Sequence, residues 1–147
     1  MAKIRTSLHG RIVGITDEAR LGVLNQPYSV TFTPAAGSTN VCEITIRVVD
    51  YDGTTVAATH LLDIWLSDAA TGAGLTATSA SGAVAAKAAS GVDFQIYSAK
   101  KAFRVQTLAT GLYVLSITDS AKTAFYPCAS IVGQTVVGTQ LVTGNYG

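Results

Sequence analysis

The side chains that could carry out chemistry are few and widely spaced in this chain. His60 and Asp63 are three residues apart in a predicted strand, and Ser67 or Ser116 would complete the residue types of a hydrolytic triad. A triad is defined by geometry, and the G-x-S-x-G sequence that presents a nucleophilic serine does not occur. We therefore expect His60 to be a structural residue, and we predict that the protein is not an enzyme.

The acidic residues, glycines and cysteines match no complete ligand-binding pattern. DYDG, residues 50–53, is like the start of an EF-hand loop, but the later acidic ligands and the glutamate at position twelve are missing. TGAGLT, residues 71–76, lacks the lysine of a phosphate loop. Cys42 and Cys128 have no zinc-binding spacing. We predict no metal and no cofactor, and two reduced thiols because no secretory signal is recognised.

The densest cluster of cations lies in the first eleven residues, which carry three positive charges and no acid. The rest of the chain carries seven lysines and arginines against nine acids. Residues 3–12 alternate, with Ile4, Thr6, Leu8, Gly10 and Ile12 on one face and Lys3, Arg5, Ser7, His9 and Arg11 on the other. A period of two predicts an extended strand. A helix with apolar residues four apart is the alternative, which Gly10 and Gly14 disfavour.

The composition predicts a single domain with a surface poor in charge. Only 13% of the 147 residues are charged, so threonine, serine, glycine and alanine must cover much of the surface. Such a surface suits a protein that packs against neighbours. No apolar stretch approaches the ~20 residues of a membrane-spanning helix, and the body is too neutral for binding nucleic acid by charge. We predict no membrane and no specific nucleic acid as partners.

Alternating segments separated by turn residues predict an all-β antiparallel sandwich over residues 30–147, preceded by an extended arm and connection over residues 1–29. We expect hairpin turns at residues 50–53 and 110–111. Residues 67–93 are expected to be loops around a short strand at 75–79, with a helical turn within 83–90 as the alternative. The expected strands are 30–33, 41–49, 54–66, 94–98, 101–109, 112–118, 123–132 and 134–144.

Three segments resemble parts of immunoglobulin-like domains. TDSAKTAFYPC, residues 118–128, resembles the region before the second cysteine of the immunoglobulin fold, with Tyr126 two residues before Cys128 and Trp65 between the cysteines. ITIRVVDYDGTTVAATHLLDIWLSD and LATGLYVLSITD look more like bacterial domains of the invasin type. This resemblance implies an Ig-like sandwich. A disulfide between Cys42 and Cys128 stays open as the alternative to two thiols.

The opening MAKIRTSLHGRIVG and the ending QLVTGNYG are similar to structural proteins of tailed bacteriophages. The resemblance implies a capsid decoration or cement protein on the virion surface, assembled in the host cytoplasm. It would act in multiple copies or as a homo-oligomer that stabilises the shell of the major capsid protein. The alternative is a tail or fibre module that recognises a host-surface glycan or protein. The expected capsid-binding residues are Lys3, Ile4, Arg5, Leu8, His9, Arg11 and Ile12.

Overall fold

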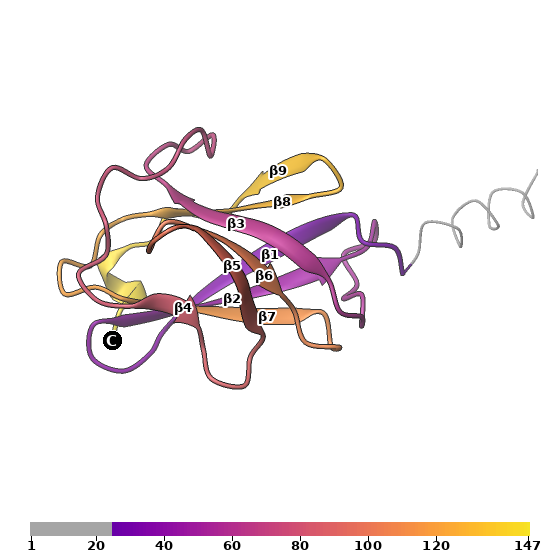
Figure 1. Ribbon diagram of the computed structural model, residues 1–147, viewed down its shortest axis with the longest axis horizontal. Coiled ribbons are helices and arrows are strands. Elements are labelled where there is room, and N and C mark those ends of the chain that lie inside the picture. Colours follow the sequence, from indigo (N-terminus) through magenta and orange to yellow (C-terminus); the bar gives the residue numbers. More distant parts are fainter. Residues whose placement is uncertain (1–24) are drawn as a thin grey trace, which may run out of the picture.

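Strands form where apolar and polar residues alternate, and they pack as two antiparallel sheets in the computed structural model, which describes residues 25–147 (Figure 1). The prediction of an all-β sandwich is confirmed. The described elements are β1 (Ser29–Ala36), β2 (Val41–Val49), β3 (Leu61–Ser67), β4 (Val84–Ala86), β5 (Val92–Ser98), β6 (Ala102–Gln106), β7 (Leu112–Thr118), β8 (Tyr126–Ile131), β9 (Gln134–Val137) and the 3-10 helix η2 (Thr143–Asn145).

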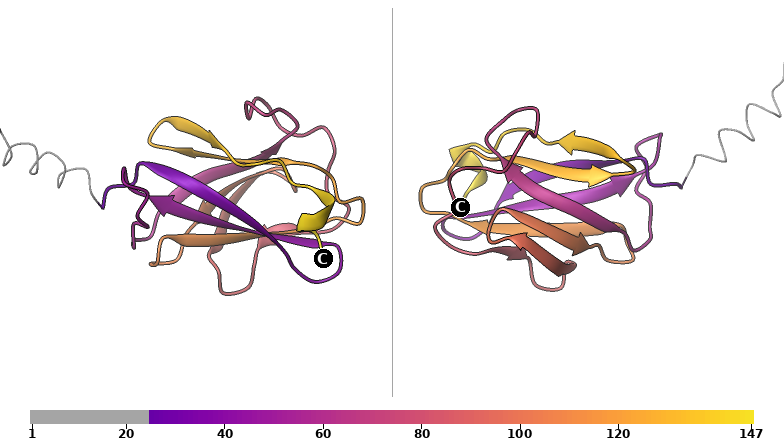
Figure 2. Two further views of the ribbon diagram at one scale, coloured as in Figure 1. Left: turned by 180° about the vertical axis from the view of Figure 1, so that it is seen from behind. Right: turned by 45° about the horizontal axis from the view of Figure 1, so that its top comes forward.

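The strand order places each element in one of two layers. One sheet has the order β1-β2-β7-β4, and the facing sheet has the order β5-β6-β3-β8-β9 (Figure 2). The first sheet and β3-β8-β9 follow the A-B-E-D and C-F-G order of immunoglobulin sandwiches. β5 and β6 extend the second sheet where a variable-type domain has its extra strands, but here β4 precedes them in the chain. The order in space is therefore immunoglobulin-like, although the order along the chain is not.

The core is formed by the inward faces of both sheets. In β2 the alternate residues from Cys42 to Val48 are at most 1% exposed, as their spacing predicted. Leu62, Ile64 and Leu66 of β3 belong to the same buried cluster. Other buried members of this cluster include Val56, Phe103, Val105, Tyr113, Leu115, Ile117, Phe125, Leu141 and Tyr146.

The hairpin predicted at residues 50–53 is wrong, because the chain passes from one sheet to the other after this turn. Both edges of β2 are occupied, by β1 and by β7, so a return strand over residues 54–66 has no edge to pair with. After the turn, the pairing of the chain with β2 is limited to a bridge between Val49 and Thr55 and a hydrogen bond from the Val56 amide to the Val48 carbonyl. β3 begins only at Leu61, and it pairs with β6 and β8.

The hairpin predicted at residues 110–111 is also wrong, since β6 and β7 lie in different sheets. The turn itself forms, with the Gly111 amide donating to the Leu108 carbonyl. Gly111 has a φ of 76°, and a Cβ atom there would lie 2.2 Å from the Val56 carbonyl oxygen. A glycine is therefore needed at this position, because the turn lies directly against the backbone of Val56. This tight turn connects β6 of one sheet to β7 of the other.

The segment between β3 and β5 differs from its prediction. Residues 75–79 are not a strand. The Thr76 amide donates to the Leu66 carbonyl of β3, but the Thr76 hydroxyl and the Ala77 amide donate to the Asp68 carboxylate, so no regular strand ladder continues along this segment. The strand in this segment is β4, which pairs with β7, and no helical turn forms in its place. By contrast, the antiparallel pair β8 and β9 occurs within the two final strands that the sequence predicted.

Asp119 ties three segments together at the end of β7. Its side chain is almost fully buried and accepts hydrogen bonds from the backbone amides of Ser81 at 3.0 Å, Ala121 at 3.3 Å and Thr123 at 2.8 Å. Burial raises the pKa of this carboxyl, but the hydrogen bonds from Thr123, Ser81 and Ala121 outweigh burial and lower the pKa to about 2. The charged carboxylate is therefore a structural group.

Replacing Asp119 with alanine leaves buried amides without an acceptor, and we expect the free energy of unfolding at neutral pH to fall by at least about 2 kcal/mol. A carboxyl with a lowered folded-state pKa stabilises the fold above its ordinary pKa of about 3.9, and this stabilisation is lost as the pH falls toward about 2. Urea unfolding across this range should show the difference between wild type and variant shrinking. Glu43→Gln, in an exposed ion pair with Lys87, should change stability by less than about 1 kcal/mol.

Candidate functional site

The predicted arm contacts lie outside the described residues, so they remain predictions. These are Lys3, Ile4, Arg5, Leu8, His9, Arg11 and Ile12. What the structure does describe is the junction at which the body begins, and the surface that the body offers to a partner.

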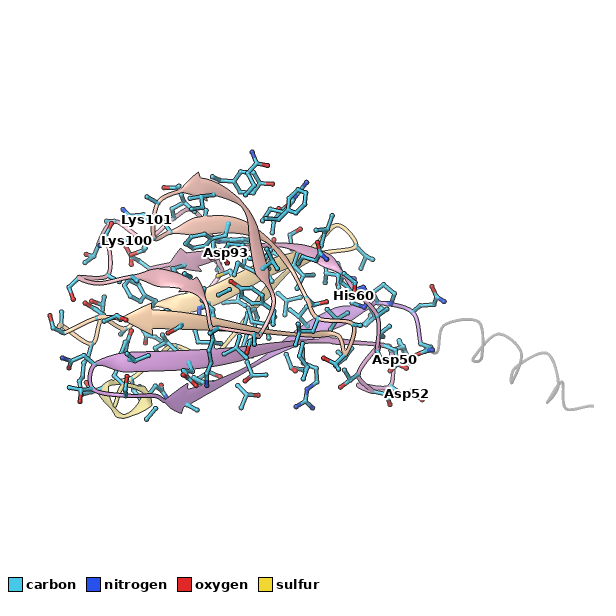
Figure 3. All side chains as sticks on the ribbon, turned by 60° about the horizontal axis from the view of Figure 1, so that its bottom comes forward. Asp50, Asp52, His60, Asp93, Lys100 and Lys101 are labelled. Carbon is cyan, nitrogen blue, oxygen red and sulfur yellow. The ribbon has the colours of Figure 1, made fainter. Side chains whose placement is uncertain are left out.

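The junction is held by the carboxylate of Asp50. One oxygen accepts a hydrogen bond from the backbone amide of Asn25 at 3.0 Å. The other oxygen accepts hydrogen bonds from the backbone amides of Asp52 at 3.0 Å and Thr54 at 2.9 Å. The hydrogen bond from Asn25 is the main reason that the pKa of Asp50 lies below its usual value. Asp50 thus fixes the first described residue against the 50–54 turn. Figure 3 shows Asp50 and Asp52 together at this end of the sandwich, far from Lys100 and Lys101.

Two exposed tyrosines lie beside this junction. Tyr28 and Tyr51 are 45% and 62% exposed, and their rings meet edge to face with centroids 5.4 Å apart. The Tyr28 amide also donates to the Val49 carbonyl, which continues the ladder of β1 to the junction. Aromatic side chains are enriched in protein interfaces, so this junction end is a candidate contact surface. We call this surface the junction end and define it as Asn25, Tyr28, Asp50 and Tyr51.

A second candidate surface is the free edge of β5, which we call the β5 edge and define as Val92, Phe94, Ile96 and Tyr97. Each of these side chains is at least 50% exposed. β5 is the last strand of its sheet, so one of its edges has no strand partner among residues 25–147. Register shifts leave Phe94 and Tyr97 without partners on β6. Such shifts mark a β-bulge or a similar irregularity, which redirects side chains from the regular alternation.

The side chain of Asp93 points into the sandwich and holds β5 to the facing sheet. Its carboxylate accepts the Tyr113 hydroxyl at 2.5 Å and the Ala86 amide at 3.0 and 3.1 Å, so it bridges to β7 and β4 of the facing sheet. Figure 3 shows Asp93 on the inner side of its strand. Burial raises the pKa of the Tyr113 hydroxyl, which therefore stays protonated and donates. The strand is anchored by a polar contact while its apolar side chains remain exposed.

The basic residues beside β5 are already engaged within the protein. Arg104 donates to both oxygens of Asp63, from Nε at 2.7 Å and Nη2 at 2.8 Å, and this contact lowers the pKa of Asp63. The Tyr97 hydroxyl donates to the same carboxylate at 2.9 Å, and the guanidinium lies 5.8 Å from the Tyr97 ring centroid. Lys100 and Lys101 donate to backbone carbonyls within residues 77–81. This arrangement agrees with a structural role and does not resemble a phosphate-binding patch.

The candidate triad is not assembled. Nε2 of His60 lies 3.3 Å from the Val56 carbonyl oxygen, Asp63 is paired with Arg104, and the Ser67 hydroxyl donates to the Ala73 carbonyl. Ser116 lies on β7 in the other sheet. Within residues 25–147 there is also no group of three or more potential metal ligands. In the same part of the chain, no helix is long and apolar enough to cross a membrane.

Trp65 and the two cysteines occupy strands like those of immunoglobulin domains but face different directions. Cys42 on β2 points into the core, whereas Cys128 pairs with Trp65 on the outer face of its sheet. The Trp65 indole donates to the Gly72 carbonyl at 2.9 Å, and a Cβ atom at Gly72 would lie 3.2 Å from the Cys128 sulfur. Residues 67–77 therefore cover Cys128, and both cysteines are buried free thiols whose pKa burial raises to about 11.

Sequence reasoning missed the β5 edge as a surface. It predicted a strand at residues 94–98 but assigned no contact surface to that strand. The available signal was the run of apolar residues in VDFQIYS, residues 92–98, without a lysine, arginine or proline. Comparisons with protein-family models, curated proteins and solved structures found no match to this chain.

The contact between Trp65 and Gly72 predicts selective protection of Cys128. Trp65→Phe removes one hydrogen bond, worth about 1 kcal/mol, so local opening of residues 67–77 should increase about fivefold. Native-state labelling with an aromatic disulfide reagent should then be faster at Cys128 and unchanged at Cys42. Tyr51→Phe, outside this segment, should leave both rates unchanged. Equal acceleration at both cysteines would show global unfolding and contradict the local role of Trp65.

Proposed function

We propose that this protein is a bacteriophage capsid decoration protein that binds the assembled shell of the major capsid protein and stabilises it. The observation that carries the proposal is a cationic N-terminal segment with a period of two, attached at a defined junction to a sandwich with little surface charge. The resemblance of the first fourteen residues to structural proteins of tailed bacteriophages supports the same function.

The arm has the residue pattern to bind a shell that offers an exposed strand edge. An extended segment adds main-chain hydrogen bonds to an exposed strand edge, while alternate side chains fill pockets. Ile4, Leu8 and Ile12 would be the apolar contacts, and Lys3, Arg5 and Arg11 would meet acidic groups. Ordering the arm costs conformational entropy, so each arm binds weakly by itself. Stabilisation of the shell would therefore depend on many copies bound to it.

The junction end supports the proposal because it would present the arm together with two aromatic contacts. The Asn25 amide is held by Asp50, and Tyr28 and Tyr51 are exposed beside it. A partner that binds the arm therefore also meets the end of the sandwich. Stabilisation follows from linkage, since a ligand that binds only the assembled shell adds about 2.7 kcal/mol at a concentration one hundred times its Kd.

A host-recognition module would use its loops for binding, and the loops within residues 67–93 give this alternative little support. Residues 67–81 are tied down by contacts such as Trp65 to Gly72 and Asp68 to Thr76 and Ala77. Residues 67–93 contain no aromatic side chain that could stack on a sugar. A recognition module would need to use the β5 edge instead.

Co-sedimentation with emptied phage heads tests the proposal. The full chain should bind, and a chain lacking residues 1–15 should lose most of its binding, because the arm makes the main contacts. The core of residues 25–147 is formed among those residues, so the deletion should leave the melting temperature nearly unchanged. If neither chain binds heads, or if both bind equally, the proposed mechanism is wrong.

Neutralising the arm separates its charge from its apolar contacts. Arg5→Gln with Arg11→Gln should weaken head binding at low salt about tenfold and reduce the dependence of binding on ionic strength. Lys122→Gln, which removes a half-buried cation of the sandwich whose Nζ donates to the Gly147 carbonyl, is the control and should bind like the wild type. An equal loss in the control would point to net charge and not to the arm.

A further inference from the structure

Among the edge strands of the described sandwich, β5 is the one with more than four residues and no proline, although two register shifts against β6 interrupt its regular pairing. The other edges are shortened or interrupted: β4 has three residues, β9 has four, and β1 contains Pro34. β5 has seven residues and no lysine, arginine or proline. Its single charged residue, Asp93, accepts hydrogen bonds from Tyr113 and Ala86 of the facing sheet, so its carboxylate adds no charge to the free edge.

The charges around β5 favour a neutral strand as its partner. Lys100 and Lys101 lie in the turn that follows β5 (Figure 3). A cationic segment such as residues 3–12 would add positive charges beside these side chains. A second β5 adds no cation. In an antiparallel pair the two Lys100–Lys101 turns lie at opposite ends, whereas a parallel pair would place them side by side.

We propose that β5 pairs antiparallel with β5 of a second copy of this chain, about a two-fold axis near Gln95. The two five-stranded sheets would then join into one continuous sheet, and the exposed side chains of the two β5 edges would contact each other across the new strand pair. A two-fold contact uses the same patch on both copies, so each favourable contact occurs twice. Phe94 and Ile96 flank Gln95, which brings Phe94 of each copy next to the strand position of Ile96 in the other.

The pairing goes beyond the proposed function, because it requires neither a phage head nor the arm. It concerns the protein free in solution, where it predicts a reversible dimer. Its failure would leave the head-binding experiment unaffected, and a failure to bind heads would leave the dimer unaffected.

Sedimentation velocity of the full chain over a range of concentrations tests the pairing. We expect a dimer that forms as the concentration rises, and Ile96→Lys should weaken self-association at least tenfold, which is about 1.4 kcal/mol. The matched control is Val132→Lys, because Val132 has the same 60% exposure but lies after β8, at the other side of the sheet. This control should dimerise like the wild type. A chain that is monomeric at every concentration, or equal weakening by both substitutions, overturns the proposal.

A cysteine at the expected axis tests the register. Directly opposed residues of an antiparallel pair have Cα atoms about 4.5–5.5 Å apart, which a disulfide can span. Gln95→Cys should therefore form a disulfide-linked dimer under mild oxidation much faster than Val132→Cys. The native cysteines are buried and should not compete. Equal rates would overturn the register. A full chain that is monomeric while a chain lacking residues 1–15 dimerises would show that the arm covers β5, which also overturns the proposal.

Discussion

The carboxylate of Asp93 joins the two sheets along the side where β4 and β5 lie. Tyr113 is fully buried in the centre of the sandwich, and its hydroxyl needs an acceptor there. Asp93 supplies that acceptor and also binds the Ala86 amide, so an acidic residue must point inward from an edge strand. The register of β5 shifts immediately after this residue, and it shifts again before Ser98. The second shift brings Tyr97 onto the Asp63–Arg104 pair, and the strand is left with an apolar free edge.

The charged groups of the body are used mainly for its own architecture. Asp50 holds the junction, Asp119 joins loops at the other end, and Asp63 neutralises Arg104. The lysines at 100 and 101 bind carbonyl groups of the preceding loop. Because these groups are committed to internal contacts, the described surface offers partners apolar side chains and strand edges.

A comparison with the immunoglobulin sandwich shows how a similar order of strands in space can surround a different core. Cys42, Trp65 and Cys128 lie on the strands that carry the disulfide and the tryptophan in antibody domains. The side chains of a strand alternate, so a shift by one residue exchanges the two faces. Here Trp65 and Cys128 are on the outer face, where residues 67–77 cover them, and the tryptophan secures this segment instead of packing on a disulfide.

Alternation alone was enough to find the strands that bury one face, because a period of two reports burial directly. The bounds of β2 and β7 agree with the segments predicted at 41–49 and 112–118. The local pattern did not show which strands pair with each other. The turns at 50–53 and 110–111 have residue types that are typical of hairpin turns, but each turn connects strands of different sheets. Whether a turn leads to a hairpin depends on which strand edges are free, and distant strands decide that. The inward position of Asp93, the outward position of Cys128 and the exposed β5 edge likewise follow from packing between the sheets.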